Sequence, residues 1–373
     1  MAALSRQIDR LADLVNLPTG VLIVVLAALA ALGVGTLVRL GATSRLPRDK
    51  GRALRLRLRS WWILFLVLAA AVIIGPAAVI ALFLAASLLA LREFNTIARA
   101  GAGAPVRPAP PQWAWIFAPA QYALIYLGLG AAALAFIPVG AVLALTVIAT
   151  LAPRSAAGVP RAGGATPDTG AALAPRGFLR AAGAATWSAM LLIYFVSHAP
   201  MLLTAPPAPG LDLAGGLGLL VYLMILTETN DISQALWGRR FGRRKVVPRI
   251  SPGKTWEGLL GGGLTTVVLA IALAPLLTPW APAPPDPDAT GVAPAGLLVW
   301  WLWPAVVGLI LCPAGFLGDI AMSALKREAG VKDSGDLLPG QGGMLDRIDS
   351  LTFTAPVFYY LMLAALPAVE TVS

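Results

Sequence analysis

Residues Ala295–Phe316 read A-G-L-L-V-W-W-L-W-P-A-V-V-G-L-I-L-C-P-A-G-F and contain no charged side chain. A helix needs about 20 apolar residues to cross the hydrocarbon core of a bilayer, so this run predicts a transmembrane helix. Shortly after it, Ser323–Asp349 reads S-A-L-K-R-E-A-G-V-K-D-S-G-D-L-L-P-G-Q-G-G-M-L-D-R-I-D, and a second apolar run, Leu351–Val369, follows at once. Charge this dense between two apolar runs is costly unless it has a function. It is therefore the first candidate for a site.

The whole chain has the composition of a polytopic membrane protein. Of its 373 residues, 58% are hydrophobic and only 12% are charged, whereas soluble domains carry about a quarter charged residues. In a membrane protein the net charge of +10 indicates basic cytoplasmic loops rather than nucleic-acid binding. A single cysteine, Cys312, excludes an intrachain disulfide and a multi-cysteine zinc site. The single histidine, His198, lies in an apolar run and leaves little room for histidine-based catalysis.

A window of about 20 apolar residues predicts an all-α, polytopic integral membrane protein with about ten transmembrane helices. Gly75 and Pro76 separate the second predicted span from the third, and the two can form one broken hairpin. The predicted spans are Pro18–Leu37, Trp61–Gly75, Ala77–Leu91, Trp113–Leu127, Ala131–Leu151, Ala182–Leu203, Leu213–Leu226, Leu259–Leu277, Ala295–Phe316 and Leu351–Val369.

We divide the chain into two regions. Residues 1–178 hold the N-terminal transmembrane helices with flexible cytoplasmic loops, and residues 179–373 form a C-terminal catalytic transmembrane region, because the charge-bearing motifs all follow Leu226. Ala100–Pro111 and Ala152–Ala174 are rich in Ala, Gly and Pro, which is typical of flexible connectors. The amphipathic segment Met1–Asn16 either lies along the membrane interface or extends the first span.

Basic residues gather in the loops that follow the odd-numbered predicted spans, such as Arg45–Arg59 and Arg239–Lys254. The other loops are short or acidic, such as Pro285–Asp288. The positive-inside rule therefore predicts cytoplasmic basic loops and places both termini outside. We expect a multi-pass protein of the cell's inner (plasma) membrane, with its site facing the cytoplasm.

Two polar motifs precede the charged stretch. Glu228–Gln234 reads E-T-N-D-I-S-Q, in which Asn230 and Asp231 offer hard oxygen atoms for Mg²⁺ or for a ribose hydroxyl. The alternative is a helix end where polar side chains meet water. Ser251–Gly258 reads S-P-G-K-T-W-E-G and predicts a phosphate cradle, with the Lys254 charge beside a helix start. It is not a Walker A loop, and membrane topology together with anionic lipids could also explain its basic flank.

The charged stretch itself combines acids and bases. Asp319 ends the ninth predicted span, and Asp346 and Asp349 are spaced so that a helix would place them on one face. Converging carboxylates repel one another unless a cation bridges them, which Mg²⁺ with nucleotide phosphates would do. This combination favours phosphoryl or nucleotidyl transfer, and the alternative is a solvated loop of mixed charge.

Ser323–Asp349 resembles the signature of the phosphatidate cytidylyltransferase (CDP-diacylglycerol synthase) family, S-x-[apolar]-K-R-x-x-x-x-K-D followed by P-x-H-G-G-[apolar]-x-D-R-[apolar]-D. The Ser251–Gly258 block with Gly261–Gly263 is similar to this family, as is Asn230-Asp231 followed by Phe241-Gly242. The resemblance is strong over the C-terminal part of the chain, and the N-terminal part shares only its hydrophobic character.

The resemblance implies a Mg²⁺-dependent nucleotidyltransferase that condenses CTP with phosphatidate to give CDP-diacylglycerol and pyrophosphate. The catalytic residues it implies are Asp319, Asp346, Asp349, Lys326, Arg327 and Lys332. The metal ligands it implies are Asp319 and Asp346, supported by Asp349 and Asp231. The substrate-binding residues it implies are Asn230, Asp231, Ser251, Lys254, Thr255 and Gln341. CTP, phosphatidate and membrane lipids are the expected partners, nucleic acid is not, and a second metal ion and a homodimer are left open.

One residue departs from the family pattern. Gln341 stands where the signature has histidine, and glutamine can form hydrogen bonds but cannot act as a base. We interpret this position as one that orients its neighbours. Alternatives remain: a catalytically weak relative, an enzyme for another lipid phosphate, or an ion-coupled transporter. A transporter would be expected to carry its carboxylates near mid-span, whereas here they gather at predicted helix ends.

Overall fold

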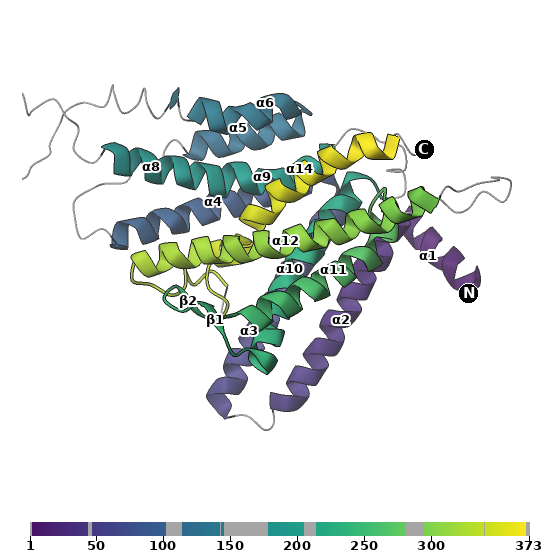
Figure 1. Cartoon of the computed structure of the whole chain (residues 1–373), viewed down its shortest axis with the longest axis horizontal. Helices are drawn as coiled ribbons and strands as arrows, with labels where there is room; N and C mark the ends of the chain where they lie inside the picture. The colour runs from purple at the N-terminus through teal and green to yellow at the C-terminus, as the bar shows by residue number, and fades with distance from the viewer. Residues whose placement is uncertain are drawn as a thin grey trace, which may run out of the picture.

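The structure, a computed structural model, describes residues 2–43, 47–101, 114–141, 143–144, 178–204, 214–280, 294–338 and 340–370. This part of the chain is almost entirely helical, and most of its long helices lie alongside one another (Figure 1). One antiparallel hairpin of two strands, β1 (Lys245–Val247) and β2 (Ser251–Thr255), lies at the margin. The predicted all-α polytopic fold is confirmed.

The N-terminal segment forms its own helix. Between α1 (Ala2–Leu14) and α2 (Thr19–Thr43), Asn16 takes a positive φ of 52°, which interrupts the helical path. The alternative that this segment extends the first span is therefore wrong. The other N-terminal elements are α3 (Arg48–Ile74), α4 (Pro76–Gly101), α5 (Ala114–Tyr126), α6 (Gly130–Ala135) and a π-helical turn (Phe136–Ala141).

The predicted break at Gly75 and Pro76 is confirmed. Gly75 has a φ of 121°, a conformation that favours glycine, and Pro76 begins α4, where a proline is tolerated because its missing N–H would be unpaired anyway. The C-terminal region then contains α8 (Phe178–Ala189), a π-helical turn (Met190–Phe195), α9 (Val196–Met201), a 3-10 turn (Leu202–Thr204), α10 (Gly215–Phe241), α11 (Trp256–Leu277), α12 (Pro294–Glu328), α13 (Leu345–Ile348) and α14 (Leu351–Glu370).

Among the described residues, 7 helices are long and apolar enough to cross a membrane. The predicted spans at Trp113–Leu127, Ala131–Leu151 and Leu213–Leu226 are not among them. The first corresponds to α5, with only 13 residues; the second continues beyond the described residues; and the third lies in α10, which also carries Glu228 and Asp231. The count of about ten stays a prediction. The 7 spans are Thr19–Gly41, Lys50–Ile74, Pro76–Ala98, Gly183–Thr204, Trp256–Leu277, Trp301–Glu328 and Leu345–Ala365.

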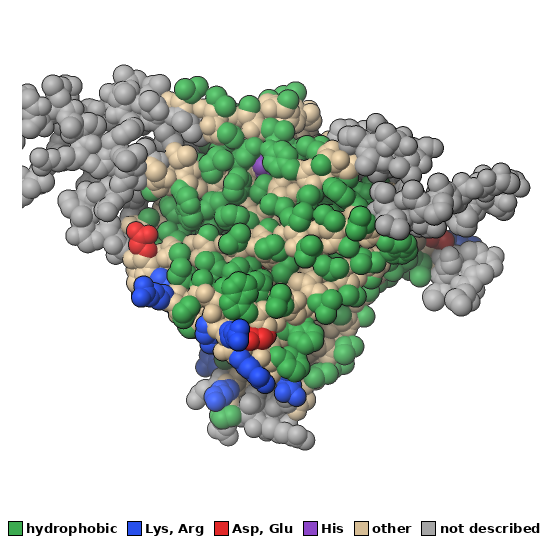
Figure 2. All heavy atoms as spheres, viewed as in Figure 1, with side chains coloured by type: hydrophobic (Ala, Val, Ile, Leu, Met, Phe, Trp, Pro, Cys, Tyr) green, Lys and Arg blue, Asp and Glu red, His purple; other side chains and the backbone are tan. Residues whose placement is uncertain are grey.

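The outer surface agrees with a membrane environment. Figure 2 shows apolar side chains over most of one face, with Lys and Arg gathered at its lower margin, near the hairpin and α3 in Figure 1. The start of α1 and the end of α14 both lie toward the right of Figure 1, on the side away from the hairpin. The cytoplasmic placement of the basic loops remains a prediction.

A stripe of small residues joins α10 to α11. Gly258, Gly262, Thr266, Ala270 and Ala274 recur every fourth position of α11 and are all buried, so the two helix backbones can approach closely. Added at Gly262, a Cβ would overlap the Gln234 side chain of α10. The stripe therefore determines the position of the C-terminal part of α10, which carries Gln234 and Asp231.

Replacing Gly262 with leucine should push α10 and α11 apart. Overpacking of a close contact costs about 1–3 kcal/mol, so we expect a lower midpoint of thermal unfolding for the purified protein, measured by size-exclusion chromatography after heating. Gly35 on α2 is the matched control, because a Cβ there meets nothing within 4 Å. An unchanged midpoint for Gly262→Leu would show that the contact with Gln234 is not close.

Candidate active site

One strand, two long helices and the link between α13 and α14 bring four charged side chains together. Lys254 on β2 has its Nζ 2.7 Å from Oδ2 of Asp319 on α12 and 3.9 Å from Oδ1 of Asp231 on α10. Asp349 lies in the link and interacts electrostatically with Lys254, Asp319 and Asp231. We call Asp231, Lys254, Asp319 and Asp349 the acidic cluster.

The close approach of α12 to this link depends on Gly318. A Cβ at Gly318 would overlap the carbonyl oxygen of Asp349, so only glycine lets α12 lie here. Ser350, the next residue of the link, donates from Oγ to Oδ2 of Asp231 at 2.5 Å. The link between α13 and α14 thus contacts both α12, next to Asp319, and Asp231 of α10.

The ammonium of Lys254 is the positive centre of the cluster. Burial alone would lower the pKa of Lys254, but the negative charges of Asp319 and Asp231 outweigh burial and raise that pKa above its ordinary value. Lys254 therefore stays charged at neutral pH. The side-chain oxygen of Gln234 lies 3.4 Å from its Nζ, which orients the ammonium further.

The cluster suits a divalent cation. It holds three carboxylates against one ammonium, and Oδ1 of Asp231 is buried without a hydrogen-bond partner. No group of three Asp, Glu, His or Cys side chains within the described ranges is arranged to hold a metal by itself. Mg²⁺, however, commonly binds one or two carboxylates and takes further oxygens from substrate phosphates. One or two of these carboxylates would fit a Mg²⁺ that takes its remaining oxygens from a bound phosphate, and the choice among Asp231, Asp319 and Asp349 stays a prediction.

Asp346 has different neighbours. Its Oδ1 lies 2.5 Å from Nζ of Lys326, and its Oδ2 accepts hydrogen bonds from Ser334 N at 2.8 Å, Ser334 Oγ at 2.9 Å and Gly343 N at 3.1 Å. Both carboxylate oxygens are thus occupied within the protein. A metal-ligand role for Asp346 stays a prediction, and its surroundings favour an anchor that folds the 334–346 loop onto α12.

A second carboxylate in this loop region was missed from sequence. Glu93, on α4, accepts hydrogen bonds from Met344 N at 2.8 Å, Leu345 N at 2.9 Å and Ser334 Oγ at 2.9 Å. It satisfies two backbone donors at the start of α13, which would otherwise be unpaired. The available signal was a single acid near the end of an apolar helix, but nothing in the sequence connects α4 to a loop about 240 residues later.

Gln341 forms hydrogen bonds with two arginines, and its role as an orienting residue stays a prediction. Its Nε2 donates to the Arg57 carbonyl at 2.7 Å, and its Oε1 accepts from Nη1 of Arg347 at 3.0 Å. Arg57 in turn donates from Nε to the carbonyl of Gly340 at 3.0 Å. Gln341 therefore ties the loop to α3 while holding the Arg347 side chain.

Removing these contacts should be more harmful than restoring the histidine of the family signature. Gln341→Ala loses the contacts to both arginines and should lower turnover by about thirtyfold, at about 1 kcal/mol for each hydrogen bond. Gln341→His can still donate from one ring nitrogen and accept at the other, so its turnover should stay within about threefold of the original. Steady-state rates of the two variants provide the comparison. Equal loss in both would rule out a hydrogen-bonding role.

The remaining predicted site residues lie around the two groups. Asn230 is buried and bonds to Cys312, Gln234 and Thr266, so its side chain joins helices rather than facing the cluster. Thr255 accepts from Gly258 N at 3.1 Å and caps α11. Three others complete the predicted set: Arg327 donates to the carbonyls of Ile250 and Val331, Lys332 is exposed, and Ser251 is half-buried on β2. Roles for these residues in substrate binding stay predictions.

A model of the cytidylyltransferase family matches residues 55–365 of the chain. The chain belongs to the cytidylyltransferase family. The resemblance found in the sequence is therefore confirmed. The matched segment contains Glu93, the acidic cluster and the 334–346 loop.

Curated relatives match two different extents of the chain. An uncharacterized protein of Escherichia coli (strain K12), YnbB, is 38% identical over 336 residues, covering 89% of this chain and 95% of that protein. The phosphatidate cytidylyltransferase of Haemophilus influenzae is 41% identical over 145 residues, covering 39% of this chain and 46% of that enzyme. That of Pseudomonas aeruginosa is 40% identical over 148 residues, covering 40% and 48% respectively. The chain thus matches about half the length of these named enzymes.

Proposed function

We propose that this protein is a CTP-dependent nucleotidyltransferase that converts phosphatidate to CDP-diacylglycerol. The observation that carries the proposal is the acidic cluster, in which Lys254 lies 2.7 Å from Asp319 and 3.9 Å from Asp231. Phosphatidate cytidylyltransferases that are about 40% identical over part of the chain support the choice of reaction.

The reaction joins two polyanions. A phosphate oxygen of phosphatidate attacks the α-phosphorus of CTP, a new P–O bond forms, and the bond to the β-phosphate breaks, releasing pyrophosphate. The attacking oxygen is already anionic, so no strong general base is needed. The main demand on the protein is to hold the substrates in line and to offset their repulsion.

Each group of residues has a part in this. Lys254, charged at neutral pH, would hold CTP phosphates at the mouth of the cluster. One or two carboxylates of the set Asp231, Asp319 and Asp349 would hold Mg²⁺, which neutralises phosphate charge when bound. Lys326 is fixed by Asp346 at 2.5 Å and would present its remaining donors beside the loop. Glu93 and Gln341 keep that loop in place from α4 and α3.

The position of the site in the fold suits both substrates. Asp319 and Lys326 lie toward the C-terminal end of α12, and Lys254 lies just before α11. Lys254 lies just before the candidate span Trp256–Leu277 and Lys326 near the end of Trp301–Glu328, where CTP could enter from water and phosphatidate from the bilayer. We place this end on the cytoplasmic side of the inner membrane, because the basic loops gather there.

One assay tests the proposal. The purified full chain is incubated with labelled CTP, Mg²⁺ and phosphatidate, and the organic phase is analysed for a labelled CDP-lipid. We expect product that depends on both substrates and disappears with EDTA. Absence of product under conditions in which the Haemophilus influenzae enzyme works would contradict the proposal, and product only with another lipid phosphate would correct the acceptor.

A further inference from the structure

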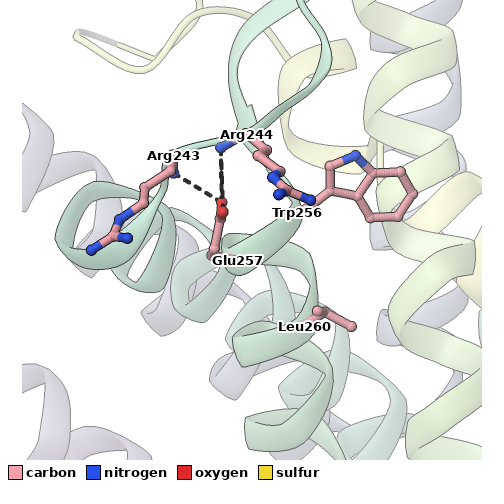
Figure 3. Close-up of a pocket in the computed structure, with 5 residues that line it drawn as sticks. All are labelled: Arg243, Arg244, Trp256, Glu257 and Leu260. Carbon is pink, nitrogen blue, oxygen red and sulfur yellow. Dashed lines mark hydrogen bonds between the residues drawn. The ribbon is translucent and has the colours of Figure 1, made fainter.

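An open hollow of about 570 Å³ lies where the loop after α10 meets the first turns of α11 (Figure 3). It is lined by Arg243, Arg244, Trp256, Glu257 and Leu260. None of these residues belongs to the acidic cluster or to the 334–346 loop. A hollow of this size is within the range of small-molecule sites, about 300–1,000 Å³.

The lining of the hollow carries a net positive charge, because it contains two arginines and one glutamate. The carboxylate of Glu257 accepts the backbone N–H of Arg243 at 2.9 Å and that of Arg244 at 3.2 Å. Figure 3 shows the two arginine side chains leaving on opposite sides of Glu257, with that of Arg244 directed toward Trp256. Within the described part of the chain, neither guanidinium has an ion-pair partner. Both remain available to an anion.

An apolar stripe leads away from the hollow along α11. Trp256, Leu260, Leu264 and Val268 are spaced four residues apart, so they share one face of the helix, and all are exposed. Leu260 and Leu264 are 71% and 63% exposed, and the stripe begins at the first residue of the candidate span Trp256–Leu277. Cationic groups therefore stand at a membrane surface directly beside a path suited to acyl chains.

We propose that this hollow binds an anionic glycerophospholipid, separately from the acidic cluster. The guanidinium group of Arg244, which is directed toward Trp256, holds the headgroup phosphate, and Arg243 adds positive charge from the other side of Glu257. The acyl chains lie along Trp256, Leu260 and Leu264. A zwitterionic lipid fits less well, because its own ammonium would approach two cations. A soluble phosphate compound would leave the apolar stripe unused.

The site is connected to Lys254 through β2. The backbone N–H of Trp256 donates to the backbone carbonyl of Arg244 at 3.0 Å. Thr255 ends the strand that carries Lys254 and caps α11. A bound lipid would therefore steady the hairpin from its outer side. This proposal concerns binding and stands whether or not the protein transfers a cytidylyl group.

The test uses lipids whose acyl chains carry bromine, which quenches tryptophan fluorescence on contact. The full chain is reconstituted in phosphatidylcholine vesicles, and brominated phosphatidylglycerol, which is not a phosphatidate, is titrated in. The difference between the original chain and Trp256→Phe isolates the contribution of Trp256. We expect saturable quenching at low mole fraction, and an apparent affinity about tenfold lower in Arg243→Gln/Arg244→Gln, the scale of one lost charge-assisted hydrogen bond to the headgroup phosphate.

A matched control removes the same charge outside the hollow. Arg239 and Arg249 belong to the same basic run and are exposed, but neither lines the hollow, so Arg239→Gln/Arg249→Gln should stay within about twofold of the original. Equal loss in both double variants would overturn the proposal in favour of general surface charge. Equal quenching by brominated phosphatidylcholine would overturn the preference for an anionic headgroup. Release of the lipid by CTP would instead identify a nucleotide-phosphate site.

Discussion

Asp319→Asn is expected to lower CDP-lipid formation by about 10²–10³-fold, the scale of losing one well-placed electrostatic partner in an active site. Asparagine keeps the shape of the side chain but removes the charge that lies 2.7 Å from Nζ of Lys254. The cluster then has fewer hard donors for Mg²⁺, and Lys254 loses its nearest counter-ion. We expect the loss to persist at saturating CTP and phosphatidate, measured as initial rates over a Mg²⁺ titration.

Asp336→Asn is the matched control for this experiment, because Asp336 is an exposed acid of the charged stretch. It removes the same charge without touching the cluster and should leave rates within about twofold. Both variants should keep the thermal midpoint of the original chain. If Asp319→Asn turned over almost normally at high Mg²⁺, Asp319 would have to be removed from the proposed metal site.

Glu93→Gln should lower the turnover number by about 10- to 100-fold with little change in the Michaelis constant for CTP. Hydrogen bonds to a charged group contribute about 1.5–3 kcal/mol, and the amide of glutamine would turn a donor toward one of the backbone N–H groups. The start of α13 should therefore loosen while Lys254 and Asp319 stay in place. Steady-state kinetics give the first readout.

Hydrogen exchange gives a second readout for Glu93, independent of activity. The amides of Met344 and Leu345 donate directly to the Glu93 carboxylate, so their exchange should accelerate in Glu93→Gln. Glu328→Gln, an exposed acid at the end of α12, is the control and should leave both amides unchanged. Unaltered exchange in Glu93→Gln would show that other contacts hold the loop.

The sequence predicted the architecture because apolar runs determine membrane helices almost alone. The resemblance to a known family implied that Asp231, Lys254 and Asp319 belong to one site, and each of them lies near the end or the beginning of an apolar run. The packing of the helices that brings these residues together could not be predicted from the sequence. The buried stripe from Gly258 to Ala274 and the contact of Gly318 with the α13–α14 link depend on packing between distant segments.

The detailed geometry was less predictable. The spacing of Asp346 and Asp349 predicted a shared helix face, but α13 has only 4 residues and ends at Ile348. Asp349 keeps a helical conformation at the end of α13 and interacts electrostatically with Asp319, Asp231 and Lys326, while Asp346 bonds directly to Lys326 and Ser334. Ser251–Thr255, expected as a loop before a helix, pairs with β1 as a strand, because Lys245 and Val247 offer it an antiparallel partner.

The hydrogen bonds from Glu93 and Arg57 to the 334–346 loop make the two halves of the chain depend on each other. Both residues come from the N-terminal helices, yet they grip the 334–346 loop more than 240 positions later in the chain. A fragment beginning near residue 179 would retain every carboxylate of the acidic cluster. It would lack the hydrogen bonds that Glu93 and Arg57 form with the 334–346 loop. Co-expression of the two halves should then restore what neither has alone, as in split-protein complementation. Substitutions in the N-terminal half should therefore be tolerated only where they keep the hydrogen bonds of Glu93 and Arg57 to this loop.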